Sequence, residues 1–196
     1  MARLKEFDED MAIDAAVDCF WRRGYETTSM RDLARSMGIG GASLYNAYGD
    51  KRALFVQSLE RYANRSMRER ITRLQAMHRP REAIEAFIQE IIERSLADRE
   101  RKGCLLVNSA LDVAPHDAEL GGVVAGYLEE IRLFFRRNIE AAAKARQVSR
   151  RMDSESASIH LLGVVIAIRV MARTGATRRV LEALAAPALD VLSARQ

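Results

Sequence analysis

Apolar residues recur at helical spacing along most of the chain, most clearly within residues 27–55. Gly38 can take the left-handed conformation that ends a helix, and Asp50 is placed to cap another one. Between these points a second short helix is predicted from about 40 to 47. The first helix has one apolar face, because apolar side chains follow at i, i+3, i+4 and i+7: Met30, Leu33, Ala34 and Met37. The pattern predicts two short helices joined by a tight turn and followed directly by a third.

The flanking residues continue the helical pattern. Helices are predicted at 8–23, 50–77, 80–97, 102–117, 117–146, 154–173 and 177–194. Pro115 should stop the short apolar helix before it, and Pro187 should kink the last helix or divide it in two. Residues 154–173 are apolar nearly all round, which implies burial on more than one side. The chain is therefore expected to be all-α, with about nine helices arranged as a small head and a larger body.

Composition agrees with a helical protein, because 48% of the 196 residues are hydrophobic and only three are proline. The formal net charge of +4 permits nucleic-acid binding, but it is unevenly distributed. Residues 1–50 contain six cations and nine acids, whereas the basic excess lies in residues 51–79. Any phosphate contacts are therefore expected to be local, with most of the basic residues solvating a long helix.

The short second helix suits a DNA groove, because it has few core residues and many small or polar ones. Residues 27–55 resemble the DNA-binding head of the TetR family of bacterial transcriptional regulators. The resemblance rests on fourteen positions: Thr28, Arg31, Asp32, Leu33, Ala34, Gly38, Ile39, Ser43, Leu44, Tyr45, Tyr48, Asp50, Lys51 and Leu54. Gly40, Gly41 and Ala47 depart from the family pattern, which leaves the base code open. The resemblance implies a helix-turn-helix domain at 1–48 and a ligand-binding and dimerisation domain at 49–196.

Within the head, positioning and base reading are expected to separate. Lys51, Tyr45, Thr28 and Arg31 are predicted to hold phosphates, and the hydroxyl groups of Thr28 and Ser29 to serve the amides of their helix. Asn46 is the best candidate for reading adenine. The full predicted DNA-binding set is Thr28, Ser29, Arg31, Gly40, Gly41, Ala42, Ser43, Tyr45, Asn46 and Lys51. The resemblance implies a repressor that binds a near-palindromic operator as a homodimer.

In the body, an apolar small-molecule inducer is expected between the helices of 80–146, and its binding should shift the long helix of 50–77. The predicted ligand-binding residues are Phe87, Ile91, Cys104, Asn108, Tyr127, Ile131 and His160, with His116 and Arg169 as further polar groups. Residues 103–117 also resemble a branch of the family that responds to reactive or unsaturated molecules. Cys104 follows Arg101 and Lys102 near a helix start, which favours a thiolate. It is either an electrophile or oxidant sensor or an inert packed thiol.

The last two helices are expected to pair with a second copy of the chain. The predicted interface residues are Leu161, Val165, Ile168, Leu181, Leu184 and Leu192. The N-terminal segment is charged throughout, and the longest uncharged apolar run, 156–168, is too short to span a bilayer. A soluble cytoplasmic protein with reduced cysteines is therefore expected.

The sequence leaves two other classes of function to consider. A thiol hydrolase would need Cys104 with His116 or His160, and an architectural DNA-binding protein would need a broad basic face, which the acidic head lacks. The sequence contains no glycine-rich phosphate loop and no His/Cys cluster with metal-ligand spacing, so no cofactor and no metal are expected.

Overall fold

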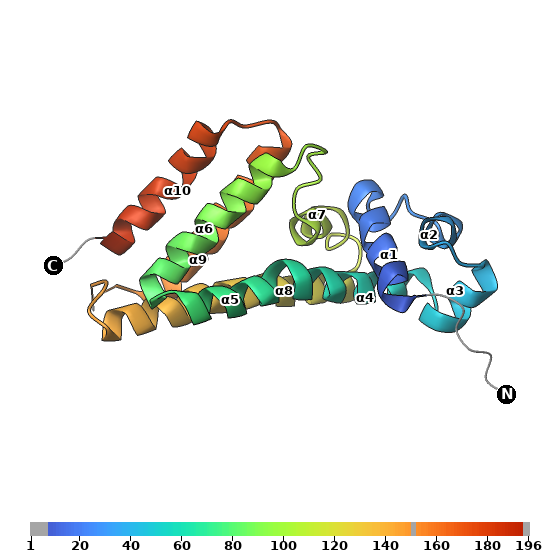
Figure 1. The fold of residues 1–196 in the computed structure, drawn as a ribbon, viewed down its shortest axis with the longest axis horizontal. Coiled ribbons are helices and arrows are strands. Elements are labelled where there is room, and N and C mark those ends of the chain that lie inside the picture. The colour runs from blue at the N-terminus through green and yellow to red at the C-terminus, as the bar shows by residue number, and fades with distance from the viewer. Residues whose placement is uncertain (1–7, 150–151, 194–196) are drawn as a thin grey trace.

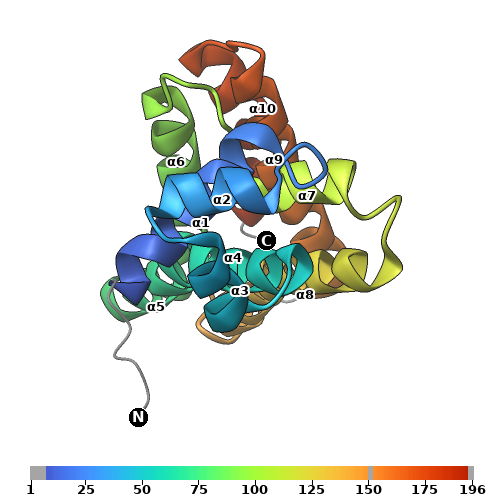
Figure 2. The same cartoon turned by 90° about the vertical axis from the view of Figure 1, so that its right-hand side faces the viewer.

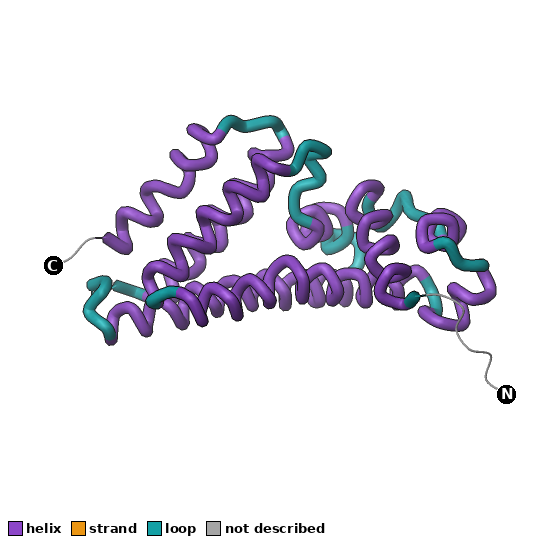
Figure 3. The backbone as a smooth tube through the Cα atoms, viewed as in Figure 1, coloured by secondary structure: helices purple, strands orange, loops and turns teal. Residues whose placement is uncertain are grey.

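The computed structural model describes residues 8–149 and 152–193, and within these ranges every regular element is helical (Figures 1 and 3). The elements are α1 (Glu9–Arg23), α2 (Met30–Met37), α3 (Gly41–Tyr48), α4 (Lys51–Ala63), the π-helical η1 (Asn64–Arg68), α5 (Glu69–Met77), α6 (Pro80–Ala97), α7 (Leu105–Asp112), α8 (Ala118–Lys144), α9 (Ser154–Arg173) and α10 (Arg178–Ser193). Because α4, η1 and α5 follow without a break, they form one long helix. The described residues thus contain nine continuous helices, which confirms the prediction.

Helices α1, α2 and α3 form the head. The Ser29 side chain accepts a hydrogen bond from the Asp32 amide, and the Asp32 carboxylate accepts one from the Ser29 amide, so α2 begins with a capping box. Gly38, at φ 67°, ends α2 in the left-handed region. The rings of Phe20 on α1 and Phe55 on α4 meet edge to face, 4.9 Å apart. The head core therefore includes residues of α4, beyond the boundary predicted at 48/49.

The helix formed by α4, η1 and α5 runs from the head along the whole body, with α8 beside it (Figure 1). On the other side of the body, α6 packs against α8 and α9, and α10 packs against α9 and α6. The centre of this arrangement is aromatic. The ring centroid of Phe87 lies 5.1 Å from that of Phe134 and 5.3 Å from that of Phe135. Movement of the body helices can reach the head through α4, because α4 belongs to both cores.

Helix α10 continues through Pro187, so of the two predicted alternatives, a kink or a division, the division does not occur. Proline removes one backbone hydrogen bond from a helix interior. On either side of Pro187, the side chains of Ala185 and Ala188 are buried, as are those of Leu181 and Leu192. Both halves are thus fixed by packing of the helix on its neighbours, and this outweighs the lost hydrogen bond.

Helix α9 has 20 residues and is long and apolar enough to cross a bilayer by length and composition alone. The uncharged run within it, residues 156–168, is shorter. Helix α9 also contains Arg169, which is buried among the other helices of the body. Contacts with α6, α7, α8 and α10 surround much of α9. These contacts are those of a helix in the core of a helical domain.

Candidate DNA interface and effector region

Helix α3 has one face in the head core and one face toward solvent. Leu44 is fully buried and Tyr48 nearly so, whereas Tyr45 is 56% exposed. The side of α3 away from the core also contains Gly41, Ala42, Ser43 and Asn46, all exposed, and exposed Gly40 is its N-cap. Figure 2 looks at the end of the molecule where α2 and α3 lie. The residues predicted to face DNA therefore share one accessible surface.

Three residues at the start of α2 that are predicted to contact DNA differ in their exposure to solvent. Arg31 is exposed, and Ser29 is exposed while its hydroxyl caps α2. Thr28 is only 1% exposed, and its hydroxyl donates to the Gly24 carbonyl at 2.6 Å. The Thr28 side chain is thus a packing group in this structure, which contradicts its predicted phosphate contact. Sequence spacing placed Thr28 near the surface helix but could not show that its hydroxyl turns inward.

The two cations at the start of α4 have different surroundings. Lys51 Nζ donates to the Tyr25 carbonyl at 3.1 Å and lies 4.2 Å from the centre of the Tyr25 ring. Arg52 instead pairs with Asp117 at 2.6 Å and with Glu119, both at the start of α8. Arg52 links the head to the body.

Further ion pairs connect α1 to the body. Arg61 and Arg65 of the long helix both bind Asp14, at 2.8 and 2.5 Å. A hydrogen bond from Arg61, followed by contributions from Arg65, holds the pKa of Asp14 below its usual value despite partial burial. Lys102 binds Asp18 at 2.9 Å. Two basic residues of 51–79, Arg61 and Arg65, therefore pair with an acid of the head and are not the solvated charges that the sequence predicts.

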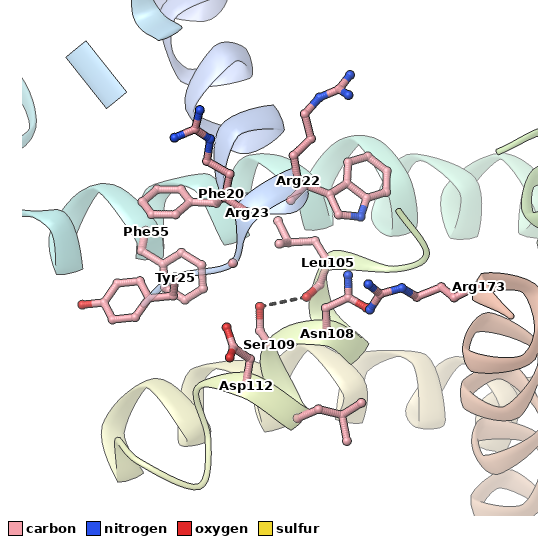
Figure 4. A pocket seen from close by; sticks show the side chains of 13 residues that line it. Phe20, Arg22, Arg23, Tyr25, Phe55, Leu105, Asn108, Ser109, Asp112 and Arg173 are labelled. Atoms are coloured by element: carbon pink, nitrogen blue, oxygen red, sulfur yellow. Dashed lines mark hydrogen bonds between the residues drawn. The ribbon is translucent and has the colours of Figure 1, made fainter. Parts of the chain in front are cut away.

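A pocket of about 350 Å³ lies at this junction, between the end of α1, α4, α7 and the last residue of α9 (Figure 4). Asn108, Ser109 and Asp112 of α7 line it, and Arg173 donates to the Asn108 side-chain oxygen at 2.9 Å. Of the predicted ligand-binding residues, this pocket includes only Asn108.

The structure does not bring the predicted ligand-binding residues together. Phe87, Ile91 and Ile131 are buried in the body core. Tyr127 donates to Glu60 at 2.7 Å and lines a separate pocket of about 500 Å³ between α1, α4 and α8. His160 is exposed, in an apolar groove of about 520 Å³ formed by α9 and α10 together with Ser149, Met152 and Asp153. Helical periodicity identifies buried faces, but it cannot show where neighbouring helices leave space.

Cys104 is the N-cap of α7 and is half-buried, as expected for a residue near a helix start. Gly103 positions it, because φ there is 75° and a Cβ would lie 2.6 Å from the Arg173 side chain. Cys104 is a neighbour of Tyr62, and burial followed by this neighbour raises the pKa of the Tyr62 hydroxyl above its usual value. The Lys102 ammonium is occupied by Asp18 and Glu100. Cys19 is buried against the head core, and burial raises its pKa above the usual value for a thiol.

The predicted dimer-interface residues mostly face the interior of their own chain. Five of them are at most 4% exposed, namely Leu161, Val165, Ile168, Leu181 and Leu192, and Leu184 is half-buried. This choice of face is therefore wrong. A different apolar stripe is accessible on α9, at Ile159, Gly163, Ile166 and Val170, and a second on α10, at Val180, Ala183, Pro187 and Val191. Because α9 is apolar nearly all round, its sequence could not show which face turns inward.

Two arginines in the body core were not singled out as a pair from the sequence. Arg70 and Arg169 are 5% and 7% exposed. Arg70 lies three residues after Met67 and four before Leu74, both buried, so it occupies the apolar stripe of α5. An arginine within the apolar stripe of a helix is the sequence feature that could have predicted this buried charge.

No group of three or more His, Cys, Asp or Glu side chains suited to a metal occurs among the described residues. His116 lies in the turn before α8 and His160 in the groove beside α10, whereas Cys104 contacts Tyr62. The geometry thus gives no support to a thiol hydrolase built on Cys104.

A three-helix head whose accessible third helix, α3, follows a glycine turn defines a helix-turn-helix DNA-binding regulator. Residues 12–57 match the family described as bacterial regulatory proteins, tetR family, and residues 80–186 match the tetracyclin repressor-like C-terminal domain. The chain belongs to the TetR family of bacterial regulatory proteins. Membership of this family of transcriptional regulators excludes the enzyme alternative.

Similar proteins include the transcriptional regulator YezE of Bacillus subtilis, 40% identical over 121 residues, or 61% of this chain and 62% of that protein. The transcriptional repressor ComR of Escherichia coli is 28% identical over 123 residues, 62% of this chain and 59% of that protein. These matches span about three fifths of the relatives' lengths. A solved structure of a cysteine mutant of the TetR regulator CifR, complexed with 26-bp operator DNA, is 29% identical with a TM-score of 0.86, covering 96% and 98% of the two chains.

Proposed function

We propose that the protein is a dimeric, effector-responsive repressor that binds a near-palindromic operator through α3. The observation that carries this proposal is the accessible face of α3, where Tyr45 and Asn46 project from a helix anchored by buried Leu44 and Tyr48. The similar CifR mutant was solved on double-stranded operator DNA, and similar ComR is named a repressor, which supports the same role here. A cytoplasmic location follows from this role.

Phosphate contacts and base contacts would divide along the head. Arg31, Tyr45 and Lys51 supply charged or polar groups at its surface, which would set the register on DNA. Asn46 and Ser43 supply side chains to base edges, with Asn46 bidentate to adenine. Exposed Gly40 and Gly41 would let the backbone approach the groove closely, so that DNA shape contributes to recognition.

The accessible apolar stripes of α9 and α10 would form the dimer interface. Each stripe is continuous over about eleven residues, and Gly163 at the centre of α9 has no atom within 4 Å of the position of a Cβ. Small residues permit close approach of helices. The apolar groove beside His160 adjoins the same face. A second copy would cover these side chains and place two copies of α3 on one face of the DNA.

Selection of binding sites from random DNA tests the proposal most directly. We expect enrichment of an inverted repeat whose half-sites are about one helical turn of DNA apart or slightly more. Sedimentation at micromolar concentration should give twice the 22.0 kDa chain mass. Failure to enrich any sequence, together with a monomeric protein, would exclude the proposed function.

The effector would act on the long helix formed by α4, η1 and α5. An effector releases DNA only to the extent that it prefers the non-binding conformation. The contacts of Arg52 with Asp117 and of Arg61 with Asp14 join this helix to both head and body. A body conformation that displaces the helix would therefore change the separation of the two heads.

A thiol signal at Cys104 is the second candidate, and its contact with Tyr62 favours it. Tyr62 lies on α4, so modification or oxidation of the Cys104 thiol would act directly on the long helix. Replacement of Cys104 by Ser separates the two signals, as argued in the Discussion.

A further inference from the structure

The body core contains more buried positive charge than its carboxylates balance. Arg70 Nε lies 3.2 Å from Glu90 Oε2, but Arg70 Nη2 is buried with no hydrogen-bond partner among the described residues. Arg169 donates to the neutral Ser95 hydroxyl at 3.1 Å. Both arginine side chains are more than nine-tenths buried. Burial of a charge is unfavourable unless the charge is paired and hydrogen-bonded. A bound anion would therefore stabilise this arrangement.

The two arginines come from two different helices of the body. Arg70 is on α5, two residues after η1, and Arg169 is on α9. Burial, followed by the positive charges of Arg94 and Arg169, lowers the pKa of Arg70 to about 10. Arg70 therefore remains charged at neutral pH. Arg70 contacts Glu90 and Arg169 contacts Ser95, and these two partners lie five positions apart on α6. The two guanidinium groups therefore approach the same stretch of α6.

The surroundings of Arg70 are apolar on one side. Its guanidinium carbon lies 5.5 Å from the centre of the Phe87 ring, which belongs to the aromatic cluster with Phe134 and Phe135. Ligand sites commonly combine apolar walls with a few polar groups that fix orientation. A charged group at Arg70 and an apolar body against Phe87 fit that combination.

We propose that Arg70 and Arg169 bind the carboxylate of a small organic acid, and that this acid is the effector of the repressor. The proposal names the ligand class for the function proposed above and rests on it. A planar guanidinium presents paired donors that match the two oxygens of a carboxylate, which a neutral ligand or a lysine cannot reproduce. The organic acid would satisfy Arg70 Nη2 and compensate the charge of Arg169.

The position of Arg70 explains how binding reaches the DNA. A carboxylate held by Arg70 and Arg169 joins α5 to α9, so its affinity depends on the spacing of these helices. The π-helical segment Asn64–Arg68 interrupts the regular hydrogen bonding just before Arg70. Such segments often mark functional sites in helices. The acid would bind more tightly to the conformation with one particular spacing of α5 and α9. If that conformation is the one that does not bind DNA, the difference in affinity releases the operator.

Thermal unfolding and operator release test the proposal on the full-length protein. Acetate, butyrate and benzoate are each compared with the corresponding amide, at ionic strength matched with sodium chloride. We expect at least one carboxylate to raise the melting temperature by about 5–10 °C at a hundredfold excess over its dissociation constant, and to weaken operator binding. The amides should do neither. Equal stabilisation by sodium chloride, or no stabilisation by any of the three acids, would overturn the proposal.

Variants show whether the arginines bind the acid or only support the fold. Arg70→Met and Arg169→Met should lose the response to the acid. Arg73→Met should keep it, because Arg73 also binds Glu90, at 2.7 Å, but its side chain is 47% exposed. Without ligand, Arg70→Met should melt no lower than the unchanged protein, because it removes an incompletely paired buried cation. A lower melting temperature together with a lost response would make Arg70 a structural residue and overturn its role.

Arg70→Lys provides a second variant that keeps the charge and loses the planar donor pair. It should fold and bind the acid at least tenfold more weakly, and an unchanged affinity would contradict carboxylate recognition. The two proposals fail separately. Operator binding without any response to carboxylates would refute the ligand class alone, whereas stabilisation by a carboxylate without operator binding would refute the repressor.

Discussion

The guanidinium of Arg52 lies 2.6 Å from the carboxylate of Asp117, and this contact joins the first turn of α4 to the residue that caps α8. Asp117 serves both functions, because its Oδ1 also accepts from the Leu120 amide at 3.0 Å. The hydrogen bond from the Leu120 amide, and then the charge of Arg52, hold the pKa of Asp117 below its usual value. The contact is therefore one of several charged pairs that connect the head and the start of α4 to the body.

Removing this pair should weaken the connection between effector and operator more than it weakens the fold. Asp117→Asn keeps the cap, since asparagine is also a good N-cap, but removes the charge that Arg52 binds. The side chains are 39% and 26% exposed, so the effect on the melting temperature should be small. Effector titrations of operator release should show a reduced maximal response in Asp117→Asn and in Arg52→Met. Arg73→Met is the control, and an unchanged response in both variants would exclude Arg52 from the coupling.

Asn46 and Lys51 should have separable effects on DNA binding. Asn46→Ala should cost about 1–3 kcal/mol on the preferred operator and alter the preference at one base pair, because it removes a bidentate contact. Lys51→Ala should weaken binding to all sequences and reduce the slope of log affinity against log salt by about 1, if Lys51 leaves Tyr25 to bind phosphate. Selection profiles and salt titrations measure these effects. An unchanged selection profile in Asn46→Ala would reject its role in base reading.

Thr28 should contribute to stability and not to phosphate binding. Thr28→Val keeps the shape of the side chain and removes the hydroxyl that donates to the Gly24 carbonyl. We expect a loss of about 0.5–1.5 kcal/mol in the free energy of unfolding, with the salt dependence of operator binding unchanged. Urea unfolding and salt titrations check this. A flatter salt dependence with unchanged stability would restore the phosphate contact.

Gly163→Arg should prevent dimerisation without disturbing the fold of each chain. No atom lies within 4 Å of a Cβ at this position, so the arginine has space within its own chain and would meet only the second copy. Sedimentation should show monomers, and operator affinity should fall because one head replaces two. Gly126→Arg on α8 is a matched control, since its Cβ position is equally open. A dimeric Gly163→Arg protein would move the interface away from this stripe.

Cys104→Ser should distinguish a thiol sensor from reversible ligand binding. If the thiol is the sensor, oxidant or electrophile should no longer release the operator, while operator binding itself remains. The serine retains a hydroxyl that can bond to Tyr62, so the fold should persist. Gel-shift assays with and without oxidant measure the effect, and Cys19→Ser is the control that should behave as the unchanged protein. Unaltered release in Cys104→Ser would leave the reversible effector as the signal.

The sequence by itself determined the local structure and the family. Helical periodicity, the capping residues Ser29 and Asp50 and the left-handed Gly38 specify each helix from neighbours only a few residues away, so they can be identified along the chain. The motif around Tyr45 and Lys51 identified the DNA-binding head for the same reason. Each of these signals lies within one or two turns of helix.

Only the tertiary structure decided which partner each side chain meets. In the folded chain the Thr28 side chain is buried and Arg52 forms an ion pair with Asp117. On α9, Leu161 is buried and Ile159 is exposed. The tertiary structure also brought Arg70 and Arg169, 99 positions apart, into one core with too few carboxylates. Hydrophobic periodicity predicts that one face of a helix is buried. The packing of helices that are distant in the sequence determines which face this is, where cavities remain and which charges have no partner.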